Sequence, residues 1–445
     1  MTTKIYFILL LWLGGLTLGI AQEPGTLSLA DAIGLALAQN KAIKLQRLQT
    51  EVAASQVSKA VAGQGPTVDA LGLGSYSNNF SQLDLRTFQP EPAPSEINIE
   101  ESGVESFNLN LGLRADYVVY DGGQGKQRYR LLVGQSQLAR AEQEVLINQT
   151  ALVVSQLYFE LLRIQNQEGF LLENLELSQA RLAKIKDRAQ FGQANRLAVL
   201  RGETSLRQDE SALDEVRLAK RQLQEELRFL LDLPADEAFR VLPAFSEWQL
   251  PPMQELETTI VRDNPELILA RQGILLADDQ LSLQQRAQSP LLAASANLGY
   301  LYQNNEVQQL AELQSVGGVL GLTARYRIYD GGQRKRSVEK AQLEVAIEQQ
   351  REDRLEHRLV SQARQERERV LLIREQLRRE RENVRTFDEA FAKVEDRYYT
   401  GQATALDLRD AQLARLDVRL RIDQLQIDLQ KAKLKLDQWQ GKLLD

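Results

Sequence analysis

Two carboxylates in the last part of the chain, Asp407 and Asp410, are spaced so that they could form a negatively charged site. Residues three apart share one face of a helix, so the two acids would concentrate negative charge there. Repeated by symmetry in an assembly of identical copies, they would form a ring. Such a ring repels anions, attracts cations and raises the pKa of its own members through like-charge repulsion. Taken alone, the pair is better explained as solvated acids at a helix start, where the helix dipole favours negative charge.

The sequence has few of the residues that catalytic or metal-binding sites require. The 445 residues include no Cys and a single His, His357, which excludes thiol nucleophiles, disulfides and imidazole-clustered metal sites within one chain. There is no Gly-rich phosphate-binding loop, so we expect neither an enzyme nor a bound cofactor. The formal net charge is -7, and a chain without a basic excess is a poor general binder of nucleic acid.

The first residues have the pattern of an export signal. Lys4 precedes a short apolar run, and the small residues Gly19 and Ala21 come just before Gln22. This predicts a secretory signal peptide over residues 1–21. A retained anchor is the alternative, although the run is short for a bilayer. Without Cys we expect no lipoprotein anchor, and without a further transmembrane helix any membrane entry would require β-strands.

The chain contains an internal repeat. The segment Tyr120-Asp121-Gly122-Gly123-Gln124 recurs 209 positions later as Tyr329-Asp330-Gly331-Gly332-Gln333, and the same shift carries Gly192 onto Gly401. Residues 22–233 and 253–445 are the predicted repeats, and the proline-rich segment 234–252 is the predicted linker between them. Each repeat is expected to contain a leading helix, a β-hairpin and a pair of long helices, with the hairpins at 66–120 and 290–329 and the helix pairs at 123–232 and 332–440.

The repeated turn residues have structural roles in this scheme. Where a strand turns into a helix, Asp121 and Asp330 can cap the new helix, and the glycines after them, Gly122, Gly123, Gly331 and Gly332, relieve backbone crowding. Gly192 and Gly401 interrupt the long helices. We expect these two breaks to lie at the end of the molecule farthest from the strands, where they would form the mouth of a tunnel.

The predicted strands alternate between apolar and polar residues. Odd positions from Phe107 to Val119 are apolar and most even ones are polar, and the second repeat keeps this pattern around Leu320 and Leu322. Period-two alternation gives a sheet one apolar and one polar face. A soluble antiparallel sheet shows the same pattern, so both interpretations stay open. Four strands are too few for a barrel, since closure takes about eight, and lipid does not tolerate open edges. Membrane strands would therefore require several copies, and three would supply twelve strands.

Three further segments have a clear pattern. Residues 123–190 and 332–400 are predicted to be continuous amphipathic helices on the order of 100 Å long, packed side by side as in coiled coils. Residues 84–105 make the first hairpin longer than the second. Their prolines and acids predict a flexible loop between strands.

The order of these features resembles the TolC family of outer-membrane efflux and secretion channels over essentially the whole mature chain. The resemblance lies in the duplication and in motifs at matching places, which are Asn40, Asn264-Pro265, Ser289-Pro290-Leu291-Leu292, Tyr76-Ser77-Asn78, both Tyr-Asp-Gly-Gly turns, Leu157-Tyr158-Phe159-Glu160-Leu161-Leu162, Arg397-Tyr398-Tyr399-Thr400-Gly401 and Ala405-Leu406-Asp407-Leu408.

The resemblance implies a mainly α fold with membrane β, built from an internally duplicated β-hairpin and very long helices. Three subunits would form a 12-stranded β-barrel in the outer membrane of a Gram-negative-type bacterium, continuous with a 12-helix periplasmic α-barrel. The implied function is a passive exit duct for a tripartite efflux or type I secretion system. Its implied partners are a periplasmic adaptor, an inner-membrane pump of the RND or ABC type, and outer-membrane lipid.

The same resemblance places Asp407 and Asp410 on the family's aperture acids, which favours the ring. In the family a Tyr and an Arg from the second repeat also latch the mouth against an acid and a hydroxyl from the first. Tyr398 matches the Tyr, but Ala403 stands at the Arg position, and Leu197 and Ala198 stand at the hydroxyl and acid positions. The latch is therefore not carried over, and substitution by Arg397 or Arg409 is an open question.

Two alternatives to the duct remain. An exported periplasmic coiled-coil scaffold with a soluble sheet would explain the helices and the alternation, and an enzyme is a distant third. Within the duct class, the sequence does not distinguish drug or metal efflux from protein secretion. Only two Met and one His weakly disfavour copper or silver as cargo.

Overall fold

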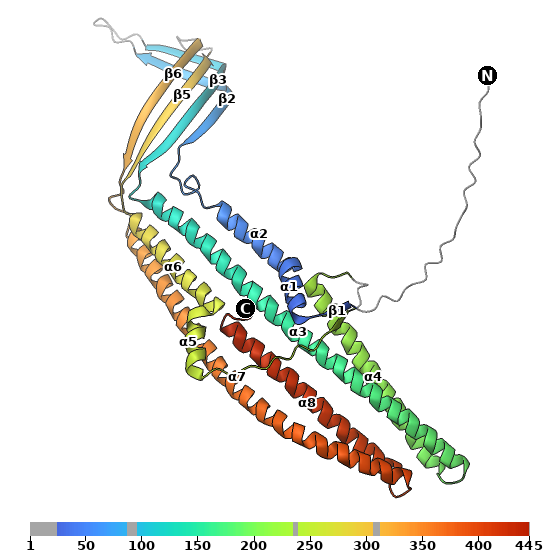
Figure 1. The fold of residues 1–445 in the computed structure, drawn as a ribbon. Helices are drawn as coiled ribbons and strands as arrows, with labels where there is room; N and C mark the ends of the chain where they lie inside the picture. Colours follow the sequence, from blue (N-terminus) through green and yellow to red (C-terminus); the bar gives the residue numbers. More distant parts are fainter. Residues whose placement is uncertain (1–24, 87–95, 235–238, 306–311, 445) are drawn as a thin grey trace, which may run out of the picture.

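The computed structural model of the protein describes residues 25–86, 96–234, 239–305 and 312–444. A four-stranded sheet stands at one end, and long helices run away from it toward two turns at the opposite end (Figure 1). The predicted signal peptide and the prolines at 90, 92 and 94 lie outside the described residues.

The sheet joins two hairpins in the order β2-β3-β5-β6, and all neighbouring strands are antiparallel. Its strands are β2 (Thr67–Arg86), β3 (Glu96–Tyr120), β5 (Leu291–Asn305) and β6 (Glu312–Arg325). The contact between the hairpins is the pairing of β3 with β5, which leaves β2 and β6 as the two edges in the described part of the chain.

The register of the strands aligns the apolar residues of both hairpins on one face. Ala70 lies opposite Leu113, which lies opposite Leu298. On the next pair, Ala296 lies opposite Leu320. Residues directly opposite each other in an antiparallel pair share a face, so the alternation predicted from the sequence produces one continuous apolar surface. The other face carries mostly polar and small residues, among them Asn108, Asn110, Arg114, Asn297 and Thr323.

Two strand boundaries differ from the sequence-based expectation. The segment 84–105, predicted as a flexible loop, is strand except at the undescribed residues 87–95, and its backbone pairs Leu83 with Ile99 and Leu85 with Ile97. Alternating Leu and Ile are a strand pattern, which the prolines and acids had outweighed. In the second hairpin, β6 ends at Arg325, before the predicted end at 329.

Four long helices form the body of the molecule. The segments predicted at 123–190 and 332–400 are α3 (Gln124–Gln190) and α7 (Gln333–Tyr399), each of 67 residues. The helices α4 (Arg196–Leu231) and α8 (Ala405–Trp439) return alongside them. The pairs α3–α4 and α7–α8 are antiparallel hairpins of helices, and α8 lies against α3, so the two pairs adjoin.

Each leading helical stretch is divided in two. The first comprises α1 (Leu29–Gln39) and α2 (Lys41–Ser55), and the second comprises α5 (Met253–Asp263) and α6 (Pro265–Arg286). The sequence-based expectation was a single leading helix in each repeat, without such a break. Asn40 and Asn264 leave the helical conformation, with ψ of 126° and 124°, and their side chains cap the following helix. An Asn cap satisfies backbone amides at a helix start, so the chain bends at each Asn.

The main apolar core lies half-way along the helices. Tyr158 and Phe159 of α3 are buried there with Leu227 and Leu231 of α4, beside a small parallel sheet of β1 (Gly25–Leu27) and β4 (Phe239–Val241). Among the described helices, α3 is long and apolar enough to cross a membrane by length and composition, which the sequence analysis had not anticipated. Its most apolar window is 44% buried inside the protein, as expected of a helix that contributes to this core.

Candidate functional site

The turns between the long helices form the end of the molecule opposite the sheet (Figure 1). Gly192 and Gly401 occupy equivalent places in them, with φ of 73° and 82°. This left-handed conformation favours glycine, because a side chain there would crowd the backbone. The helices therefore break at these two glycines, as predicted, at the end farthest from the sheet. That this end forms the mouth of a tunnel stays a prediction.

The two candidate aperture acids lie at the beginning of α8. Asp407 forms a capping box with Thr404. Its carboxylate accepts hydrogen bonds from the backbone amide and the hydroxyl of Thr404, both at 2.8 Å. These bonds, the backbone one first, lower the pKa of Asp407. Asp410 is exposed. Within the single chain Asp407 therefore has the helix-start role that the residues alone favoured, and its pKa is lowered rather than raised.

Tyr398 lies inside the folded chain rather than on its surface. Its side chain is buried with Phe391 and Leu408, and burial raises the pKa of its hydroxyl. Arg188 of α3 stands over the ring, 5.1 Å from its centre. Next to it, Lys184 lies 3.5 Å from the centre of the Tyr399 ring. The sequence analysis missed both cations, although their spacing of four along α3 places them on one helix face.

Of the described latch positions, Tyr398 contacts Arg188 of the first helix pair, whereas the apolar side chains at the other three can form no polar link between the pairs. Leu197 is half exposed, Ala198 donates its backbone amide to Asn195 at 2.9 Å as part of a helix cap, and Ala403 packs on the cluster around Tyr398. Arg397 donates to the carbonyl of Gln402 in its own turn, at 3.4 Å.

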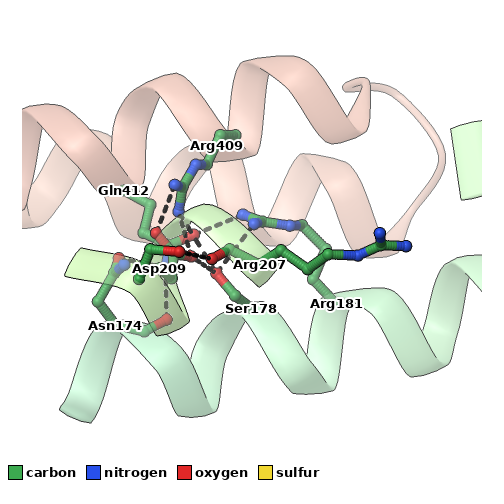
Figure 2. A network of polar contacts seen from close by, with 8 residues as sticks. Asn174, Ser178, Arg181, Arg207, Asp209, Arg409 and Gln412 are labelled. Carbon is green, nitrogen blue, oxygen red and sulfur yellow. Dashed lines mark hydrogen bonds and ion pairs between the residues drawn. The ribbon is translucent and has the colours of Figure 1, made fainter. Parts of the chain in front are cut away.

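Arg409, in contrast, reaches from α8 to the first helix pair. Its guanidinium donates to both carboxylate oxygens of Asp209 on α4, at 2.6 and 2.9 Å, inside a buried polar network (Figure 2). The sequence analysis did not single out Asp209, because no local spacing relates it to Arg409.

The three turn residues of each repeat, Asp-Gly-Gly, lie between a strand and a long helix. Asp121 accepts hydrogen bonds from the backbone amides of Gly123, at 2.9 Å, and Gly125. Asp330 accepts equivalent bonds from Gly332 and Arg334, both at 3.1 Å. The intervening glycines have φ between 67° and 86°. In each repeat the N-cap residue is a glycine, which has no side chain that could cap the helix. The Asp two positions earlier accepts the hydrogen bonds from the backbone amides at the helix start instead.

Comparison with known proteins identifies the family. The model of the outer membrane efflux protein family matches residues 32–232 and 259–442, which is most of the chain. The chain belongs to this family. No curated protein matches it.

Several solved outer-membrane channels share the fold. The Campylobacter jejuni CmeC outer membrane channel is 16% identical with a TM-score of 0.76, over 93% of this chain and 86% of that one. The outer membrane protein VceC of Vibrio cholerae is 16% identical with a TM-score of 0.70, over 93% and 96% of the two chains. The open state of the Neisseria gonorrhoeae MtrE outer membrane channel is 17% identical with a TM-score of 0.71, over 94% and 89%. These similarities establish that this member of the family has the fold of those channels.

Proposed function

We propose that the protein is the outer-membrane exit duct of a tripartite efflux or type I secretion system, and that it works as a homotrimer. Three copies of the four-stranded sheet would form a twelve-stranded barrel in the outer membrane, and the helices would extend from it as a tunnel into the periplasm. Transport through such a duct is passive, and an adaptor and an inner-membrane pump of the RND or ABC type would supply the cargo. No lipid anchor would be needed, because the barrel itself holds the protein in the membrane.

The uncovered apolar face of the sheet is the observation that carries this proposal. Leu320 is 87% exposed and Val316 is 75% exposed. A soluble antiparallel sheet packs its apolar face onto a core, and exposed apolar surface of this extent requires a partner or a lipid phase. The coiled-coil scaffold, the alternative function, offers no cover for this face.

The edges of the subunit explain why several copies are needed. Between the sheet and the middle of the molecule four helices lie side by side, in the order α2, α3, α6, α7. The edge helix α2 carries an apolar stripe of Leu45, Leu48 and Val52, each more than half exposed. The other edge helix, α7, carries exposed Leu343 and Ile347. The stripes have the three- and four-residue spacing by which helices pack. The stripe on α2 extends the unpaired edge of β2, and the stripe on α7 extends that of β6. The β2–α2 edge of one copy can therefore pack against the β6–α7 edge of the next.

Cross-linking tests this arrangement, since the chain has no Cys and introduced thiols are the only ones present. Within the chain, a Cβ at Gly134 of α3 would lie 3.2 Å from the side chain of Leu276 of α6, and the repeat carries these two positions onto Leu343 of α7 and Val52 of α2. Val52 and Leu343 of adjacent copies should therefore face each other. Oxidation of the Val52→Cys/Leu343→Cys variant should give covalent dimers and trimers on non-reducing gels. Pairing Val52→Cys with Leu406→Cys, which lies at the tip, should give none, and equal yields from both pairs would contradict the proposal.

The aperture ring makes a separate prediction. In a trimer the two acids of each subunit would place six carboxylates around one opening. We expect Asp407→Asn/Asp410→Asn to reduce cation selectivity in planar bilayers and to weaken block by multivalent cations, because the fixed negative charge is removed. Loss of the Asp407 cap is a separate effect worth about 1 kcal/mol, so Thr404→Ala serves as the control. Unchanged reversal potentials would remove the ring while leaving the duct in place.

A further inference from the structure

A groove lies where the linker between the repeats crosses the second helix pair. Residues 242–252 of the linker run over α8 and α7 on their way to α5 (Figure 1). The linker is attached to α7 by Arg374, whose guanidinium donates to the carbonyl of Trp248 at 2.8 Å and lies 4.9 Å from the centre of the Trp248 ring. Beside this attachment the groove has a volume of about 1140 Å³, and it follows α7 toward the tip as far as Thr386.

The α7 side of the groove is strongly basic. It carries a row of four arginines, which are Arg374, Arg378, Arg381 and Arg385. Spacings of four, three and four residues put all of them on one face of the helix. The groove is lined by two acids, Glu247 and Glu382, and α8 contributes only uncharged side chains. The chain as a whole has a formal net charge of -7, so the groove is a basic site on an acidic protein.

The two arginines of the row that lie nearest the tip have no partner. Arg378 pairs with Glu375 at 2.7 Å and with Glu382 at 2.8 Å. Arg381 and Arg385, in contrast, are exposed, and neither forms an ion pair or a side-chain hydrogen bond with any residue that the structure describes. Their guanidiniums are therefore available to a ligand that approaches from outside the chain.

The equivalent face of the first repeat has no such row. A shift of 209 positions leads from the four arginines to Gln165, Gly169, Leu172 and Glu176. Gln165 also holds a connecting segment, because its side chain bonds to both the amide and the carbonyl of Val241, each at 3.1 Å. Attachment of such a segment to a long helix therefore needs one polar side chain and not a row of arginines. The further arginines of the second repeat are left without a structural role of this kind.

In the proposed tunnel the groove faces outward. A linker on the inner side would obstruct the passage, so the linker and the groove beside it lie on the outside. A neighbouring copy would also leave the two free arginines open. Within the chain α8 meets α3 at Asn166 and Asn174, which the repeat carries onto Glu375 and Asn383 of α7. The two free arginines lie about 80° or more around the helix from both of these positions, at about 100° per residue.

The side chains of the groove suit an anionic chain that also has ring-shaped parts. A guanidinium and a carboxylate form two parallel hydrogen bonds. Arg381 and Arg385 are four residues apart, which places their Cβ atoms about 5–6 Å from each other, so two carboxylates of one flexible chain can reach both. Phe245 is 44% exposed at the wall of the groove, where its ring offers apolar area to the carbon–hydrogen face of a sugar.

We propose that the groove binds peptidoglycan, the cell-wall polymer in which short peptides with free carboxylates branch from a chain of amino sugars. Arg381 and Arg385 pair with the peptide carboxylates, and Phe245 packs against a sugar ring. The inference rests on the proposed duct function, since a tunnel that extends from the outer membrane into the periplasm meets the cell wall. The groove lies between the sheet and the tips, so the bound wall would hold the tunnel part-way along its length.

Co-sedimentation of the purified, full-length protein with isolated peptidoglycan sacculi tests this proposal. The wild-type protein should pellet with the sacculi in detergent solution. Titration with Arg381→Glu/Arg385→Glu should show an affinity lower by about ten-fold, because two attractions become repulsions. Arg140→Glu/Arg221→Glu is the matched control, since it makes the same charge change at two exposed arginines outside the groove, and we expect it to bind as the wild type does.

Sacculi with amidated carboxylates test the chemistry on the wild-type protein alone, so this result does not depend on how a variant folds. Amidation removes the negative charge of the peptides, and binding should fall as it does in the arginine variant. Equal binding of native and amidated sacculi would overturn the proposal, and so would equal affinities of the arginine variant and its control. Binding of poly-L-glutamate to the same arginines, without binding of sacculi, would also overturn it and would assign the groove to an acidic peptide.

Failure of this inference can be distinguished from failure of the proposed function. A wild-type trimer that conducts in planar bilayers but does not bind sacculi would overturn the peptidoglycan inference alone. A wild-type protein that forms no trimer in detergent would instead contradict the proposed function.

Discussion

Leu320→Arg should prevent the protein from assembling in the membrane. Leu320 points out from β6 on the uncovered apolar face and is 87% exposed. An arginine on the lipid-facing side of a membrane strand costs about 2–4 kcal/mol near the bilayer midplane, and every copy in the assembly would carry this cost. The expected result is loss of the protein from the membrane fraction and of the trimer on size-exclusion chromatography in detergent.

Thr323→Arg provides the matched control for this prediction. Thr323 lies on the same strand but on the opposite, largely polar face, and it is also exposed. There a charged side chain would face water, so we expect normal assembly. Equal tolerance of arginine at both positions would show that the apolar face does not meet lipid.

Gly122→Ala should destabilise the protein far more than the same change at the equivalent Gly331. Both glycines have nearly the same left-handed backbone, with φ of 68° and 67°. Alanine costs about 1–2 kcal/mol in this conformation. At Gly122 a Cβ would also lie 2.0 Å from the Cβ of Ser289, whereas at Gly331 nothing lies within 4 Å. Overpacking adds typically 1–3 kcal/mol, so the sheet–helix junction would have to shift.

Thermal unfolding of the two variants checks this prediction. The melting temperature of Gly122→Ala should fall well below that of Gly331→Ala. Ser289→Gly should restore part of the loss, since it removes the atoms that the new Cβ would meet. In a ring of copies the repeat would place Gly65 of the neighbour against Gly331, and Gly65 has no Cβ, so the control should hold in the assembly too. Equal melting temperatures would contradict the close approach.

Regular patterns made most of the fold predictable from the sequence. The alternation around Leu320 and Leu322 identified the apolar face, and the continuous amphipathic pattern over 123–190 and 332–400 located two helices whose observed ends lie within a residue of the expected ones. The bends at Asn40 and Asn264 were missed because a cap inside a helical pattern changes only a single residue. The strand pairing within 84–105 was missed because composition was weighted above alternation.

The contacts near the tip were less accessible to sequence analysis. Asp407 could be assigned to a helix start because its cap is local. Arg409 and Asp209, however, lie 200 positions apart, and their pairing depends on how α8 packs against α3 and α4. Tyr398 was expected at the aperture, whereas its burial follows from the packing of α7 against α8. Long-range polar contacts of this kind leave no periodic signal in a single sequence.

The molar mass of the purified protein, measured by light scattering with and without detergent, tests the central claim most directly. An open sheet with an uncovered apolar face and two unpaired edges should exist as an assembly of three chains in detergent and should aggregate when the detergent is removed. A stable single chain in detergent-free buffer would contradict this account.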